Sequence, residues 1–137
     1  AFSEVYQSLK TGVVDGAENN WPSYESTGHY EVAKYYSLSQ HLIIPETLCI
    51  NAAVWDTLSA DEQKILKEAA QESALLQRKL WKERSKASEE KVLAGGAVFN
   101  TIPDKSAFQD AMKPVYEKFL TDNPDLRPLV ELIQNTP

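Results

Sequence analysis

The chain has 137 residues, of which 42% are hydrophobic and 25% charged, and its formal net charge is −6. A length of this order fits one folded domain, and the acidic balance argues against a nucleic-acid partner, which needs a basic face. No apolar run approaches the roughly 20 residues that cross a bilayer. The Lys and Arg residues that gather at 78–91 alternate with glutamates, which predicts a solvated helix face.

The first predicted element is a short helix with Ser3 as its N-cap and apolar residues on one face. We expect Gly12 to end this helix in the left-handed conformation that glycine adopts without strain. Residues 13–14, two valines, then predict a short buried strand that runs into the polar loop 15–20. A buried strand followed by a polar loop is typical of a parallel α/β sheet, in which ligands lie beyond the strand ends.

A second short helix is predicted to open at residues 21–22, Trp and Pro, and to be interrupted at Gly28. Residues 38–51 are apolar and β-prone, which predicts a strand with Pro45 at an edge or a crossing point. Cys49 lies among apolar neighbours and is interpreted as a small buried hydrophobic residue. A single cysteine forms no intrachain disulfide, so the redox compartment stays open.

A long helix is the main feature of the second half. A short helix is expected at 52–58, and Ser59 with Glu62 then forms a capping box. No glycine or proline intervenes between residues 60 and 93, which predicts a helix of roughly 50 Å at 1.5 Å per residue. A compact domain of this size has a diameter of about 35 Å, so the helix must span two bodies or protrude.

The first half of this predicted helix carries a core stripe, which we expect to lack some of its cover in residues 1–137 alone. It consists of Ile65, Ala69, Leu76 and Leu80, flanked by Leu66 and Leu75. Ala87 is the only apolar residue between positions 82 and 91, so a coiled coil is not expected. A last strand at 98–102 and helices at 105–120 and 126–134 complete the predicted elements.

Several stretches carry a resemblance that extends over essentially the whole chain. Residues 2–20 (FSEVYQSLKTGVVDGAENN) closely resemble the signature region of TRAP solute-binding proteins, the DctP family. Residues 55–59 (WDTLS), the long helix and residues 112–116 (MKPVY) resemble the same family at matching spacing.

The resemblance implies an α/β fold that is part of a two-lobe periplasmic binding protein, with crossing strands as a hinge and a long helix along both lobes. In those terms residues 1–137 are the C-terminal portion of such a protein. They comprise the second lobe, a crossing strand over 38–51 and the long helix over 60–94, with most of the N-terminal lobe absent. The family's ligand lies between the lobes.

The resemblance also implies site residues. Asn19 matches a family asparagine whose amide contacts the ligand carboxylate, and Phe2 matches an aromatic residue that packs on the ligand. Glu18 and His41 match a polar pair that joins an arginine in a buried cluster and supports the site without direct contact. Glu46 aligns with a polar residue near the ligand's hydroxyl groups. The alternatives are a turn role for Asn19 and core packing for Phe2.

The ligand class rests on residues 19–26 (NNWPSYES), which resemble the branch of the family that takes up sugar acids such as uronates. Trp21 offers a stacking surface for a sugar face and Asn20 a polar group for its hydroxyls, although Trp21 and Tyr24 are equally suited to a core. A C4-dicarboxylate or a hydroxy acid is the open alternative. The family's carboxylate-binding arginine has no match here, so we expect residues 1–137 alone to bind an anion poorly.

The function implied is that of a periplasmic receptor that binds a small organic acid and delivers it to the membrane subunits of a TRAP transporter. No cofactor is expected, and an enzyme is the weaker rival, since no nucleophile elbow, phosphate loop or cysteine pair is present. Glu25 and His29 stand four apart, but two ligands do not make a metal site. The second rival is a structural interaction fragment, and residues 1–137 alone are expected to form a homo-oligomer, with domain swapping as one route.

Overall fold

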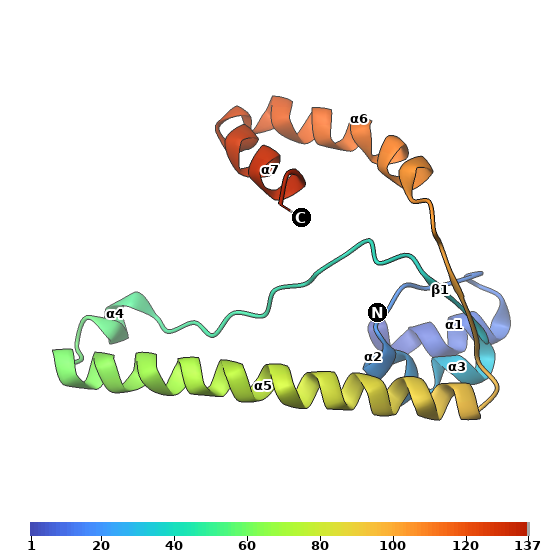
Figure 1. Ribbon diagram of the computed structural model, residues 1–137, viewed down its shortest axis with the longest axis horizontal. Helices are drawn as coiled ribbons and strands as arrows, with labels where there is room; N and C mark the ends of the chain where they lie inside the picture. Colours follow the sequence, from blue (N-terminus) through green and yellow to red (C-terminus); the bar gives the residue numbers. More distant parts are fainter. Residues whose placement is uncertain (137) are drawn as a thin grey trace. The chain divides into compact units, whose positions relative to one another are not determined.

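The glycine- and proline-free stretch forms one helix, α5 (Ala60–Ala94), of 35 residues in the computed structural model, which describes residues 1–136 (Figure 1). The predicted capping box is confirmed: the Ser59 hydroxyl accepts from the Glu62 amide, and the Glu62 carboxylate accepts from the Ser59 amide at 2.8 Å. Gly95 is the C-cap, and Gly96 follows with φ of 88°. Both ends of α5 are thus set by local sequence.

A short helix, α4 (Ala52–Trp55), precedes α5 and lies within the predicted range 52–58. The Asn51 side chain caps it by accepting from the amides of residues 53 and 54. From α5, the Gln63 amide donates to the Trp55 carbonyl at 3.0 Å, and the Lys67 ammonium lies 5.2 Å from the centroid of the Trp55 ring. The side chains of Gln63 and Lys67 thereby fasten α4 to the first turns of α5.

The N-terminal elements are short. They are η1 (Phe2–Glu4), α1 (Val5–Thr11), α2 (Trp21–Ser26) and α3 (His29–Val32). Gly12 ends α1 at φ of 72°, and Gly28, also at 72°, separates α2 from α3, both as predicted. Ser3 is not an N-cap: it lies inside the 3-10 turn η1, whose N-cap is Ala1. The chain begins its helical path two residues earlier than the capping pattern suggests.

The described residues contain one two-stranded sheet, formed by β1 (Tyr35–Leu38) and β2 (Val98–Thr101). The Val98 amide donates to the Lys34 carbonyl at 2.8 Å, and the Ser37 hydroxyl donates to the Asn100 side chain at 2.9 Å. β2 agrees with the predicted last strand to within one residue.

Two predicted strands are absent from the described part of the chain. Residues 13–14 form a bend whose amides donate to the Ser8 carbonyl, and Val13 is 75% exposed. Residues 39–51 have no regular secondary structure and are almost all exposed, so Cys49 is exposed too, contrary to the prediction. A strand needs a partner for its backbone groups, and no described strand lies beside either segment.

The chain divides into two units, each described by itself. The first, Ala1–Asn100, holds a small core of Tyr24, Val92 and Ala97, against which Trp21, Tyr30 and Tyr36 pack. This core forms where α2 packs on the C-terminal half of α5. The second unit starts at Thr101 and contains α6 (Ser106–Asp122), η2 (Pro124–Leu126) and α7 (Arg127–Gln134), with Leu120 buried. Its helices agree with the predicted ones to within two residues.

The predicted apolar stripe of α5 is present and, as expected for residues 1–137 alone, the described residues leave it largely uncovered. Ile65 is 62% exposed, and Leu76 and Leu80 are 56% and 53% exposed. Only the other end of α5 is buried, at Ser88 and Val92 beneath α2. Within residues 1–136 no helix is both long and apolar enough to cross a membrane.

Candidate functional site

The candidate site begins where the polar loop 15–20 enters α2. Asn20 is the N-cap of α2, and its side-chain oxygen accepts from the Ser23 amide at 2.9 Å. Pro22 occupies the first turn, where its absent N–H costs nothing. These local preferences place Asn19, the last residue before the cap, at the end of the loop.

Asn19 is half-buried and held on its acceptor side. Its side-chain oxygen accepts from the Asn20 amide at 2.9 Å, and its backbone carbonyl accepts from the Tyr36 hydroxyl at 2.5 Å. The side-chain nitrogen of Asn19 has no hydrogen-bond partner among residues 1–136. Its two N–H donors are therefore available, which is the chemistry that the recognition of a carboxylate requires.

An aromatic cluster contacts Asn19 through the hydroxyl of Tyr36. The Trp21 and Tyr36 rings stack with centroids 4.1 Å apart and planes at 20°, while Phe99 of β2 meets Trp21 edge-on at 6.1 Å. Tyr24 is only 5% exposed and donates its hydroxyl to the Ala33 carbonyl at 2.6 Å, so it is a core residue. Tyr36 covers one face of the Trp21 indole, which leaves at most the other face for a ligand.

Glu18 and His41, the polar pair that the resemblance implies, lie near each other. The His41 Nε2 and Glu18 Oε2 atoms are 4.0 Å apart, and His41 Nδ1 is hydrogen-bonded to the Ser39 hydroxyl at 2.6 Å. Both side chains are exposed in this chain, so the expected buried cluster is not formed by the described residues. Burial raises the pKa of Tyr36, and the charge of Glu18 raises it further.

Phe2 and Glu46 stand apart from these contacts. The Phe2 ring is 59% exposed and meets the ring of His29 edge-on at 6.0 Å. His29 is only 3% exposed, and burial lowers its pKa below the ordinary value. Glu46 is exposed and makes no hydrogen bond or ion pair with a described residue. Among the described residues, Asn19 and Trp21 thus contact Tyr36, and Glu18 lies near His41. Phe2 and Glu46 make no hydrogen bond, ion pair or ring contact with any of these residues.

Glu25 forms ion pairs with two basic residues of α5. Its carboxylate binds Arg84 through Oε2 and Lys91 through Oε1, both from α5, and its side chain is 6% exposed. Hydrogen bonds from Lys91 and then Arg84 hold the pKa of Glu25 below its ordinary value. Arg84 and Lys91 are therefore not part of a purely solvated face. No group of three potential metal ligands occurs among residues 1–136.

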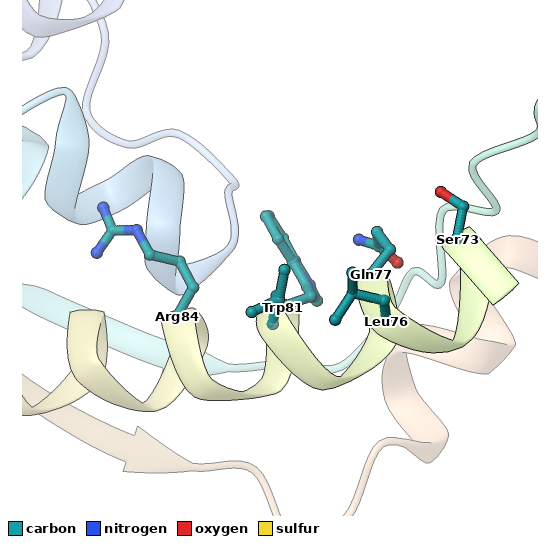
Figure 2. A pocket seen from close by; sticks show the side chains of 6 residues that line it. Ser73, Leu76, Gln77, Trp81 and Arg84 are labelled. Carbon is teal, nitrogen blue, oxygen red and sulfur yellow. The ribbon is translucent and has the colours of Figure 1, made fainter.

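A hollow on α5 lies next to this ion pair (Figure 2). Leu76, Leu80 and Trp81 line it, with Ser73, Gln77 and Arg84. Figure 2 shows Arg84 directed toward α2, where it binds Glu25. Because its guanidinium is already engaged, this arginine does not make the hollow an anion site.

Two of these features were not found from the sequence. Tyr36 reaches Asn19 across 17 positions, and Glu25 reaches Arg84 across 59. Neither sequence separation matches a helical or strand period, so no local sequence pattern predicts the contact. The basic residues at 84 and 91 stand seven apart on one helix face, which was the only available signal.

Comparison with known proteins settles the family. The chain matches the family model of bacterial extracellular solute-binding protein, family 7, DctP, over residues 1–123. The chain belongs to the DctP family. A solute-binding protein from Chromohalobacter salexigens is 55% identical over 98% of this chain and 40% of its own length. The 2,3-diketo-L-gulonate-binding periplasmic protein YiaO of Escherichia coli is 34% identical over 97% of this chain and 42% of its own length.

Two solved DctP-family structures are closer still. A TRAP periplasmic solute-binding protein from Roseobacter denitrificans, with bound β-D-glucuronate, is 66% identical with a TM-score of 0.93, covering 100% of this chain and 45% of its own. One from Sulfitobacter sp. NAS-14.1, with bound β-D-galacturonate, is 61% identical with a TM-score of 0.90, covering 99% and 45%. The chain thus spans less than half the length of the relatives it matches. The predicted fold class, part of a two-lobe periplasmic binding protein with a long helix, is confirmed.

Proposed function

We propose that the complete protein is the periplasmic substrate-binding receptor of a TRAP transporter and that it binds a uronate for uptake. The observation that carries the proposal is the likeness, above 60% identity, to two solved proteins with bound glucuronate and galacturonate. The chemistry of Asn19 supports a carboxylate ligand, because its side chain has two free amide donors at the end of the polar loop 15–20. Delivery to membrane subunits, without turnover and without a cofactor, belongs to the same proposal.

Each site residue has a role in this proposal. The Asn19 amide donates to the uronate carboxylate, and Phe2, with its ring 59% exposed, packs on the sugar. Asn20, Trp21 and Glu46 contact the ring and its hydroxyls, Trp21 with the face that Tyr36 leaves open. Glu18 and His41 act as a pair beside the site and do not touch the ligand.

A C4-dicarboxylate is the second candidate ligand. It is favoured by a 35% identical relative, the C4-dicarboxylate-binding periplasmic protein DctP of Rhodobacter capsulatus, which covers 86% of this chain. The stacked Trp21–Tyr36 pair favours a sugar ring over a small diacid. The open face of the Trp21 indole gains more contact area from a ring-shaped ligand than from a short chain.

A thermal-shift panel on the complete protein tests the proposal. D-glucuronate or D-galacturonate should raise the melting temperature, because a ligand at 100 times its dissociation constant adds about 2.7 kcal/mol of stability. D-glucose and D-galactose are matched controls that lack the carboxylate and should have no effect. A shift with succinate or malate and none with either uronate would reverse the ranking.

A further inference from the structure

Tyr36 makes the contact that holds the loop at Asn19. Its hydroxyl donates to the Asn19 carbonyl at 2.5 Å, while its ring stacks on Trp21 at 4.1 Å and lies tilted on Tyr24 at 4.9 Å. Its backbone belongs to β1, which is paired with β2. The hydroxyl is therefore presented from a fixed ring on a fixed strand, while residues 16–20 have no regular structure of their own.

The chemistry of one peptide unit links this contact to the Asn19 side chain. The carbonyl of Asn19 and the amide of Asn20 belong to the same planar group, which does not twist. Tyr36 holds the carbonyl end of that plane, and the amide end donates to the Asn19 side-chain oxygen at 2.9 Å. The direction of the plane therefore sets the direction of the side-chain amide, including its two free donors.

We propose that Tyr36 is a positioning residue for ligand binding: its hydroxyl orients the Asn19–Asn20 peptide plane and thereby aims the Asn19 amide at the ligand carboxylate. This inference rests on the proposed function, because it takes Asn19 as a ligand-binding residue. Burial and the charge of Glu18 raise the pKa of Tyr36 above its ordinary 10.0, so the hydroxyl stays protonated and remains a donor throughout the neutral range.

The same cluster provides a matched control. Tyr24 also donates its hydroxyl to a backbone carbonyl, that of Ala33, at 2.6 Å, and its ring is buried in the same aromatic cluster. Tyr36→Phe and Tyr24→Phe each delete one hydroxyl and keep the ring. Only the first removes a hydrogen bond to Asn19.

The experiment measures D-glucuronate affinity by calorimetry on the complete protein and its variants. Tyr36→Phe should weaken binding about three- to tenfold, the range for one net hydrogen bond. Tyr24→Phe should leave affinity within about twofold, although both variants lose similar stability in urea. In an Asn19→Ala background Tyr36→Phe should have no further effect, because no side-chain amide remains to be aimed.

The outcomes separate this inference from the proposed function. If Asn19→Ala weakens binding but Tyr36→Phe does not, the inference is wrong and the proposed function stands. Equal losses for Tyr36→Phe and Tyr24→Phe, or additive losses with Asn19→Ala, also overturn it, since the hydroxyl then acts only through general stability. If no uronate binds the unaltered protein, the proposed function fails and the inference fails with it.

Discussion

At the scale of single residues, the proposed hydrogen bond from the Asn19 side-chain amide to the ligand carboxylate can be tested by substitution. Asn19→Ala in the complete protein should weaken uronate binding by about 1.5–3 kcal/mol, the range for hydrogen bonds to charged groups. Asn19→Asp should weaken it more, because a carboxylate replaces the donor and repels the ligand's own carboxylate. Calorimetry measures both, with melting curves to check folding.

Asn123→Ala is a control for that experiment, because it deletes an amide that donates to the Phe119 carbonyl in the second unit. It should leave affinity unchanged. Full affinity in Asn19→Ala would remove this residue from the site.

Gly95 is required for packing, not for its backbone angle. Its φ is −77°, which any residue adopts, but a Cβ atom there would lie 2.7 Å from Cε2 of Tyr30. Gly95→Ala should therefore destabilise the protein by about 1–3 kcal/mol, as overpacking does. Gly16→Ala is the control, since nothing lies within 4 Å of its added methyl group. Urea denaturation compares them, and equal midpoints would contradict the predicted clash.

At the scale of elements, the ion pairs of Glu25 join α2 to α5. Glu25 bridges Arg84 and Lys91 with a nearly buried carboxylate, next to the packed residues Ser88 and Val92. Since α2 begins at Trp21, which we propose as a ligand contact, these ion pairs also hold the start of the proposed site against α5.

Glu25→Gln should lower the urea midpoint, and the loss should depend on pH. The pKa of Glu25 is held below its ordinary 4.5, so its contribution to stability is present above that pH. The contribution is lost as pH falls through the lower, folded-state pKa. The gap between the wild-type and Glu25→Gln midpoints should thus be widest near neutral pH and close on acidification.

Glu90→Gln is the control: it removes an exposed i,i+4 pair with Lys86 and should show little difference in midpoint at any pH. A gap for Glu25→Gln that is constant with pH would contradict the charge-based explanation.

An element could be predicted from the sequence where neighbouring residues determine it. Helix α5 needs only the Ser59 capping box and the absence of glycine and proline, and Gly12 needs only its own φ freedom. The strands predicted at 13–14 and 38–51 depend on partners elsewhere in sequence, so β-prone composition alone was insufficient. For the candidate site, the family motif predicted Asn19 and the Glu18–His41 pair, whereas Tyr36 reaches Asn19 through a nonlocal hydrogen bond that no motif predicts.

At the scale of the whole molecule, α5 carries apolar side chains that the described residues leave exposed. Ile65, Leu76 and Leu80 are each more than half exposed, and Trp81 is 47% exposed. Exposed apolar side chains that gather on one helix favour association in water. We therefore predict that residues 1–137, expressed alone, form a homodimer or higher oligomer with α5 at the interface.

Light scattering at micromolar concentration measures this association. Leu80→Glu should shift residues 1–137 toward the monomer, because it places a charge in the apolar face. Gln71→Glu is the matched control: it lies nine positions earlier, about two and a half turns, and so introduces the same charge on the opposite side of the helix. It should leave the oligomer intact. A soluble monomer of the unaltered chain that unfolds cooperatively would contradict the prediction, and equal dissociation by both variants would show that net charge, not the apolar face of α5, controls assembly.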